Sequence, residues 1–163
     1  MKKILFVTDN NNSWFLLRVV LGGVMLAHGL QKAFGWFNGF GWNNTIGYFN
    51  SVGVPSWLGA IIILLETLGA VLLILGFAGR LFALLLGVVM IGAFAIDHIP
   101  NGFFMNWAGA AGRGEGYEFD ILFWVIAAVL TINGSGNYSI DRLITKKFNT
   151  KPKSRDVLTA SMA

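Results

Sequence analysis

Four apolar segments alternate with polar or aromatic loops along the chain. Each approaches the roughly 20 apolar residues that a helix needs to cross a bilayer core about 30 Å thick. Because lipid offers no hydrogen-bonding partner to the backbone, such segments must be helical. The pattern predicts an all-α protein, an integral membrane four-helix bundle over residues 14–142. The expected spans are residues 14–33, 57–77, 80–97 and 118–133.

The loops after the first and third spans, residues 34–57 and 100–118, are rich in Trp, Phe, Gly and Asn. Aromatic rings with a polar edge favour the headgroup layer of a membrane. Within the first loop, residues 44–53 predict a short interfacial helix with Ile46, Phe49 and Val52 on one side. Two interpretations stay open: an aromatic belt that anchors the bundle, or a lid over an outward-facing pocket.

Composition agrees with a membrane environment, since 55% of the 163 residues are hydrophobic and only 12% are charged, against about 25% charged in soluble domains. The chain has no cysteine, which excludes disulfides, a dithiol redox centre and iron–sulfur ligation by its own residues. No nucleophile–base motif and no dinucleotide fingerprint is present. Any chemistry would be proton or electron chemistry aided by a bound molecule.

Basic residues are distributed unequally between the two sides of the expected bundle. Ten of the twelve Lys and Arg residues lie on the side that holds both termini, and only Lys32 and Arg113 lie on the other. The positive-inside rule therefore predicts cytoplasmic termini, with residues 1–13 as a lead-in and residues 143–163 as a basic tail. The start "MKKILFV" imitates a signal peptide, but "TDNNNSW" interrupts it. Anionic membrane lipid is the expected partner of the tail, and no nucleic-acid partner is predicted.

The first span carries a polar and small-residue stripe at helical spacing. Arg18, Gly22, Met25, Gly29 and Lys32 share one face, and His28 lies close to it. Such a stripe suits the interior of a bundle rather than lipid.

Glu66 is the one charged residue of the second span, and a charge in that position must be protonated, paired or hydrated. His28 is the partner nearest in depth, and Arg18 is the alternative. Glu66 is interpreted either as a structural carboxyl that holds two helices in register, or, with His28, as a catalytic proton-handling acid.

The remaining ionisable groups fall at the two ends of the bundle. Arg18 and Arg80 are expected to snorkel near the cytoplasmic face. At the outer face Glu118 and Asp120 point about 160° apart, so that only one of them should face inward. The residues expected to converge at the outer face are His28, Lys32, Asp97, His98, Glu118 and Asp120.

From these two groups the predicted ligand-binding residues are Arg18, Lys32, Arg80, Asp97, His98 and Glu118. His28 and His98 could in principle clamp a haem, and with Asp97 and Glu118 could hold a divalent metal. No ligand spacing supports either group, so no metal site and no haem are predicted. A polar collar at the mouth of the bundle is the plainer interpretation.

Several motifs between Arg18 and Asp141 resemble the DoxX family: "RVVLGGVMLAHGLQKAFG", "YFNSVGVPSWLG", "LLETLGAVLLILGFAGRLFALLLGVVMIGAF" and "INGSGNYSID". The resemblance implies a small, multi-pass protein of the bacterial inner membrane with four helices. It places Arg18, His28, Lys32, Glu66 and Arg80 on the family pattern without settling their roles. Loop 100–118 departs from that pattern.

The resemblance also implies a class of activity. DoxD-type relatives form part of a thiosulfate:quinone oxidoreductase, and others are linked to membrane redox complexes. A chain without cysteine would act there through bound quinone or a partner redox subunit. The first hypothesis is a subunit of a quinone-linked redox system, the second a non-catalytic scaffold or assembly factor. A small-solute transporter ranks last, because neither an inverted repeat nor a broken helix is visible. A homo-oligomer is compatible with all three.

Overall fold

The computed structural model describes residues 6, 8 and 11–149, and all regular elements in this part of the chain are helices. The prediction of an all-α protein is confirmed. Of the expected lead-in, most positions lie outside the described residues, and so does the tail from residue 150 onward. After Ser139 the chain forms helix α8, Ile140–Asn149.

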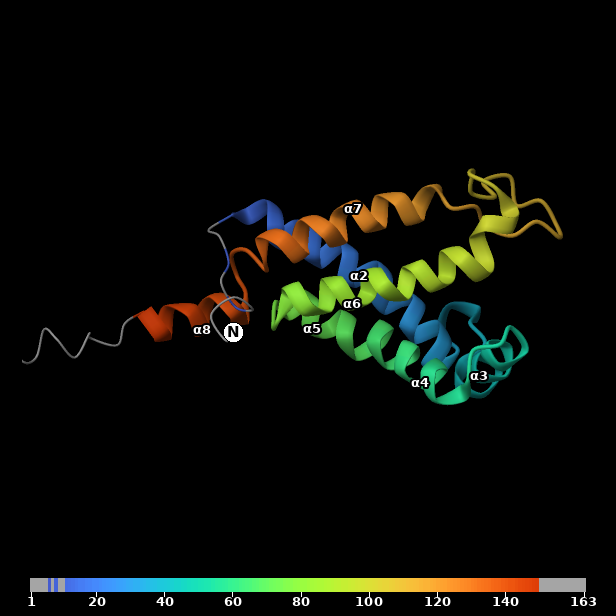
Figure 1. The fold of residues 1–163 in the computed structure, drawn as a ribbon, viewed down its shortest axis with the longest axis horizontal. Coiled ribbons are helices and arrows are strands. Elements are labelled where there is room, and N and C mark those ends of the chain that lie inside the picture. The colour runs from blue at the N-terminus through green and yellow to red at the C-terminus, as the bar shows by residue number, and fades with distance from the viewer. Residues whose placement is uncertain (1–5, 7, 9–10, 150–163) are drawn as a thin grey trace, which may run out of the picture.

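The long elements run side by side and alternate in direction (Figure 1). Helix α2 covers Asn12–Phe34. Helices α4 (Ser56–Leu64) and α5 (Ala70–Leu75) form one rod, joined by a π-helical segment over Leu65–Gly69. Helix α6 (Gly79–Ala93) continues through a second π-helical segment, Phe94–His98, and a 3₁₀ turn, Ile99–Asn101. Helix α7 (Glu118–Asn133) returns along α6.

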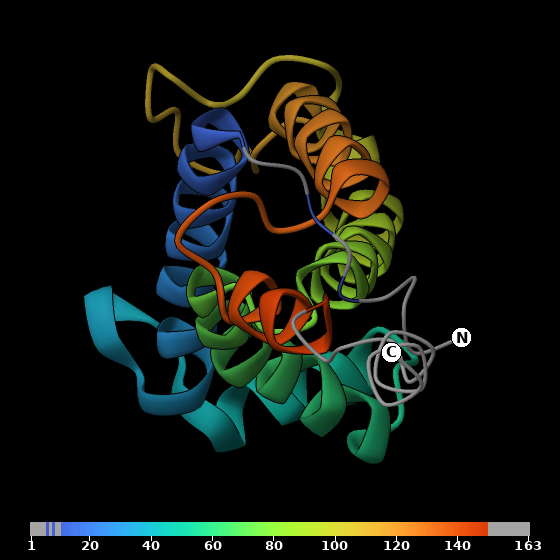
Figure 2. The same ribbon diagram turned by 90° about the vertical axis from the view of Figure 1, so that its left-hand side faces the viewer.

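The two ends of this bundle differ in character. One end carries α3 (Gly41–Ser51) and loop 100–118, and we call it the aromatic end. At the other end, which we call the basic end, the loop after α7 lies across the helix ends (Figure 2), and α8 extends outward from them (Figure 1). Hydrogen bonds from the Gly136 amide to Thr8 Oγ1 and from Thr145 Oγ1 to the Phe6 carbonyl bring the described start of the chain to this end too.

Within the described part of the chain, three helices are long and apolar enough to cross a membrane: Asn12–Phe34, Ser56–Leu75 and Gly79–Asn101. They correspond to the first three expected spans, with ends that differ by up to four residues. Helix α7 matches the expected bounds 118–133 but has only 16 residues, a rise of about 24 Å against a bilayer core of about 30 Å.

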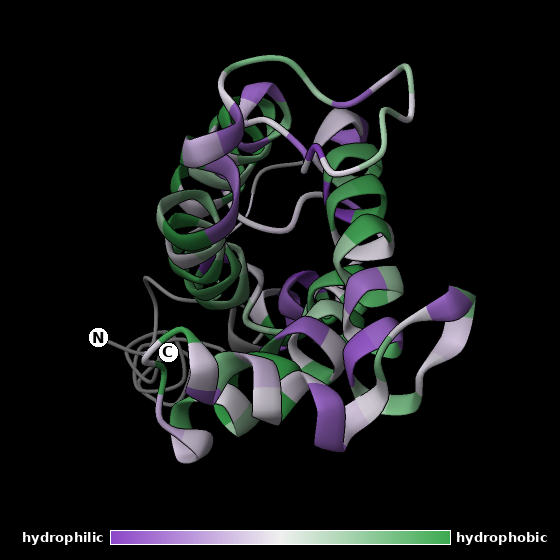
Figure 3. Ribbon diagram, turned by 90° about the vertical axis from the view of Figure 1, so that its right-hand side faces the viewer, coloured by the Kyte–Doolittle hydropathy of each residue, from purple (hydrophilic) through white to green (hydrophobic). Residues whose placement is uncertain are grey.

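Large apolar side chains are exposed along the long helices, whose ribbons are mostly hydrophobic in colour (Figure 3). Leu16, Leu64, Leu84, Val88 and Val125 are each more than half exposed. A continuous apolar surface of this kind marks an interaction surface rather than a water-facing one. The surface therefore suits contact with membrane lipid.

The inside of the bundle combines apolar side chains with close helix contact at glycines. The predicted inner stripe of α2 is confirmed, because Arg18, Gly22, Met25 and Gly29 are buried and Lys32 is half-buried. A Cβ placed on Gly29 would lie 2.5 Å from the carbonyl carbon and oxygen of Glu66. The backbone of α2 thus touches the π-helical segment directly. The buried apolar cluster consists of Leu21, Met25, Ala70, Leu73, Ala83, Leu86, Met90, Phe123, Ala127 and Leu130.

The expected interfacial helix over residues 44–53 is observed as α3, which starts three residues earlier and ends at Ser51. Thr45 and Phe49 face inward. Ile46 is half-buried, and Val52 lies beyond the helix and is exposed. The inward face is therefore centred on Phe49, against which Gly59 of α4 packs.

Candidate functional site

Glu66 and Lys32 form an ion pair between the π-helical segment and the last turns of α2. The Lys32 ammonium lies 2.6 Å from Glu66 Oε1 and 2.5 Å from Oε2, so it bridges both oxygens. The Glu66 side chain is 3% exposed and that of Lys32 is 29% exposed. In this pair the glutamate side chain is therefore buried and the lysine side chain is partly exposed to solvent. Gly29 makes this contact possible, since its missing side chain brings α2 against the Glu66 backbone.

The predicted partners of Glu66, His28 and Arg18, are wrong. His28 is exposed and forms no hydrogen bond to the carboxylate among the described residues, although it lies within electrostatic range of Glu66, Lys32 and His98. On a helix, Lys32 is about 60° from Gly29 and His28 about 100°. The residue on the Gly29 face, not its neighbour in sequence, therefore meets the acid.

A second acid–base pair joins α7 to the end of the third span. His98 Nδ1 lies 2.7 Å from Asp120 Oδ2. Asp120 is fully buried, and its other oxygen, Oδ1, has no hydrogen-bond partner among the described residues. A buried carboxylate oxygen without a partner is energetically costly and a candidate for function. The His98 side chain is 25% exposed, so this pair also has one open side.

The predicted ligand-binding residues include Glu118 but not Asp120. Only one of the two acids was expected to face inward, and the structure buries Asp120. The signal was present in the sequence: Asp120, Phe123, Ala127 and Leu130 recur at helical spacing and form the buried face of α7.

Glu118 organises the loop instead. Its Oε1 accepts hydrogen bonds from the Trp107 indole nitrogen at 2.8 Å and from the Met105 amide at 3.1 Å.

Asp97 lies in the second π-helical segment and faces α3. It accepts a hydrogen bond from the Tyr48 hydroxyl, and this bond, with some desolvation and the negative charge of Asp97, raises the pKa of Tyr48 to about 12. The phenol is thus held neutral as a donor. This contact ties α3 to the end of the third span.

The predicted snorkelling of Arg18 is wrong, because its side chain is only 1% exposed. At the basic end its guanidinium donates to the backbone carbonyls of Ile74, Ser135, Asn137 and Tyr138. The carbonyls belong to the end of α5 and to the non-helical loop after α7, where they lack helical partners. Arg18 therefore fastens three chain segments together.

Arg80 and Asp141 complete the connections at the basic end. Arg80 Nη1 donates to the carbonyls of Thr131 and Ile132, at the end of α7. Asp141 accepts from the amides of Ala78 at 2.7 Å and Gly79 at 3.0 Å. These contacts fix the turn between α5 and α6 against the start of α8, and the start of α6 against the end of α7.

The predicted outer residues thus form specific contacts: Lys32 with Glu66, His98 with Asp120, Asp97 with Tyr48, and Glu118 with the loop. Over residues 6, 8 and 11–149, no three His, Cys, Asp or Glu side chains gather closely enough to hold a metal ion. The arrangement can hold and transfer protons through two buried acids, each beside a base.

Fold and site together define a helical membrane protein with two buried acid–base pairs near one end. The DoxX family model matches residues 13–99, a little over half of the chain, and the chain belongs to the DoxX family. The match includes Lys32, Glu66 and His98 but ends before Asp120 and before the motif "INGSGNYSID". No curated protein and no solved structure gives a match.

Proposed function

We propose that this protein is an integral subunit of a quinone-linked redox system in the bacterial inner membrane. In this proposal the pairs Lys32–Glu66 and His98–Asp120 take up and release protons at the aromatic end. Electrons come from a partner subunit, since the chain has no cysteine to carry them. Family membership supports a membrane protein, and the buried pairs support proton chemistry.

The proposed topology has α7 as a fourth crossing and both termini in the cytoplasm. Helix α7 packs along α6 over its length. Because α7 is shorter than the bilayer core, the loop residues at its two ends complete the crossing in the headgroup layer. Arg142, Lys146 and Lys147 of α8 lie at the same end as Arg18 and Arg80. Concentrated Lys and Arg favour the cytoplasmic side.

One observation carries the proposal: Asp120 is fully buried, holds His98 with one oxygen and offers the other without a partner. Reduction of a quinone by two electrons requires two protons, which an enzyme supplies through positioned acids. A carboxylate in contact with a partly exposed imidazole can receive a proton from the aqueous side and pass it inward. Such positioned proton transfer contributes about 10²–10⁴ in rate.

A scaffold or assembly role is the alternative that the structure also supports. Gly29 and the Lys32–Glu66 pair hold α2 against α4–α5 by close contact, which is what a structural carboxyl would do. The two functions differ in whether the carboxylates must change their protonation state.

The test uses membranes from cells that lack this protein, complemented with the wild-type chain or with a variant, and measures the rate of quinol formation. We expect Asp120→Asn to lower the rate about a hundredfold at unchanged protein level. Glu115→Gln is the matched control, because Glu115 is an exposed loop acid that binds the Asn106 amide at 2.7 Å.

Two results would decide against redox proton transfer. If quinol formation does not depend on the protein at all, the proposal is refuted. If deletion abolishes the rate but Asp120→Asn and Glu66→Gln restore it fully, the protein serves its partner as a scaffold.

A further inference from the structure

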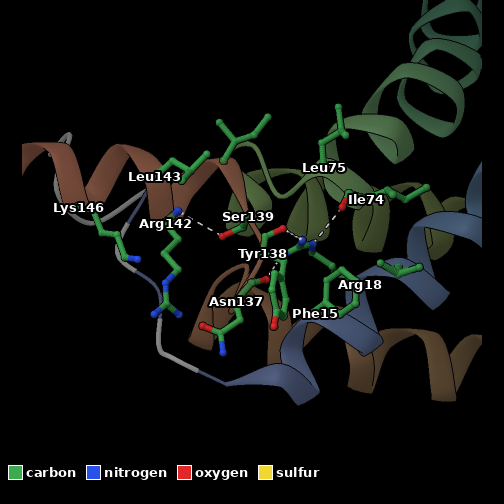
Figure 4. A pocket seen from close by; sticks show the side chains of 12 residues that line it. Phe15, Arg18, Ile74, Leu75, Asn137, Tyr138, Ser139, Arg142, Leu143 and Lys146 are labelled. Carbon is green, nitrogen blue, oxygen red and sulfur yellow. Dashed lines mark hydrogen bonds between the residues drawn. The ribbon is translucent and has the colours of Figure 1, made fainter.

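The basic end of the bundle contains a cavity of about 740 Å³ (Figure 4). It lies between the start of α2, the end of α5, the loop after α7 and α8. Its volume falls within the roughly 300–1,000 Å³ of small-molecule sites. It contains none of the residues of the acid–base pairs at the aromatic end.

One side of this cavity is polar and basic. It is lined by Asn137, Arg142 and Lys146, and none of the described residues that line the cavity is acidic. Arg142 Nη1 and Asn137 Oδ1 are buried and have no hydrogen-bond partner among the residues that the structure describes. Arg142 also forms no ion pair with any residue that the structure describes. A buried guanidinium nitrogen without an acceptor indicates that an anion completes this site.

The other side of the cavity is apolar. Val19, Ile74, Leu75 and Leu143 line it, and Leu75 and Leu143 are 49% and 67% exposed. In the view of Figure 4, Leu75 and Leu143 lie apart from the polar ends of Asn137 and Arg142. A free inorganic anion makes no favourable contact with these apolar side chains, whereas a molecule with an anionic headgroup and hydrocarbon chains is complementary to both sides of the cavity.

We propose that the cavity binds the phosphate headgroup of an anionic phospholipid. The phosphate accepts hydrogen bonds from Arg142 and Lys146, and a headgroup hydroxyl donates to Asn137 Oδ1. The acyl chains leave past Leu75 and Leu143 to the apolar outer surface of the bundle. Basic pockets at the ends of membrane helices bind such headgroups in this manner.

The experiment titrates the purified full-length protein in mild detergent with phosphatidylglycerol, phosphatidylcholine or inorganic phosphate, and follows thermal unfolding. Phosphatidylglycerol should raise the unfolding temperature and saturate, with little effect from the other two. Arg142→Gln should weaken the apparent affinity for phosphatidylglycerol about tenfold, the loss of one charge-assisted hydrogen bond. Lys147→Gln is the control, since it removes the same charge from the same helix but Lys147 does not line the cavity.

Three results would overturn the inference: an equal shift with phosphatidylcholine, an equal shift with inorganic phosphate, or equal effects of Arg142→Gln and Lys147→Gln. The first would indicate unspecific lipid contact, the second a free-anion site and the third general surface charge. If Arg142→Gln does not fold, Lys146→Gln takes its place, with the same expected weakening and the same control.

Discussion

Replacement of Lys32 by methionine is the sharpest test of the buried ion pair. The substitution keeps the length of the side chain but removes the ammonium that lies 2.5 and 2.6 Å from the two Glu66 oxygens. Glu66, with 3% of its side chain exposed, would then be a buried charge without compensation. Such a loss costs about 3–5 kcal/mol of folding free energy.

Glu66→Gln should cost less than Lys32→Met, about 1.5–3 kcal/mol, because the half-exposed Lys32 can reach polar surroundings.

The measurement is the free energy of unfolding in mixed micelles at pH 7, for wild type, both single variants and the double variant Lys32→Met/Glu66→Gln. Arg113→Met in the exposed loop serves as the control and should remain within about 0.5 kcal/mol of wild type. The reasoning is refuted if Lys32→Met costs less free energy of unfolding than Glu66→Gln.

Two further predictions concern the contacts that position the site. Gly29→Ala should destabilise the protein by about 1–3 kcal/mol, because the new Cβ would lie 2.5 Å from backbone atoms of Glu66. Gly23→Ala, whose Cβ would have open space around it, should be neutral or slightly stabilising in the same unfolding measurement, and equal effects of the two substitutions would contradict the proposed helix contact. Tyr48 should ionise near pH 12 in an ultraviolet titration, so the stabilising Tyr48–Asp97 hydrogen bond is present below pH 10 and lost as the pH rises through about 12. Asp97→Asn should return the ionisation of Tyr48 to about pH 10. An unchanged titration in this variant would show that the hydrogen bond does not raise the pKa of Tyr48.

Much of the fold followed from local patterns. Hydropathy alone located the first three spans, because the bilayer thickness sets the number of apolar residues that each span needs. The stripe of Arg18, Gly22, Met25 and Gly29 was also predictable, since a regular helix repeats every 3.6 residues. These statements need no knowledge of neighbouring helices.

The pairing of charges was not predictable in the same way. Glu66, Asp97 and His98 lie in π-helical segments, where the regular advance of 100° per residue no longer holds. The partner of Glu66 depends on how closely α2 approaches at Gly29, and the partner of His98 depends on how α7 is placed along α6. Sequence spacing within one helix carries no information on either distance.

By itself the sequence determined that the chain is helical, belongs in a membrane and carries most of its ionisable residues near the two ends of its spans, with Glu66 inside the second span, because hydropathy and helical periodicity are properties of each segment alone. Only the tertiary structure decided that Lys32 meets Glu66, that Asp120 rather than Glu118 is buried beside His98, and that Arg18 binds carbonyls instead of reaching water. Side chains from different helices meet where the helices touch, and that contact is set by glycines, π-helical segments and loops acting together.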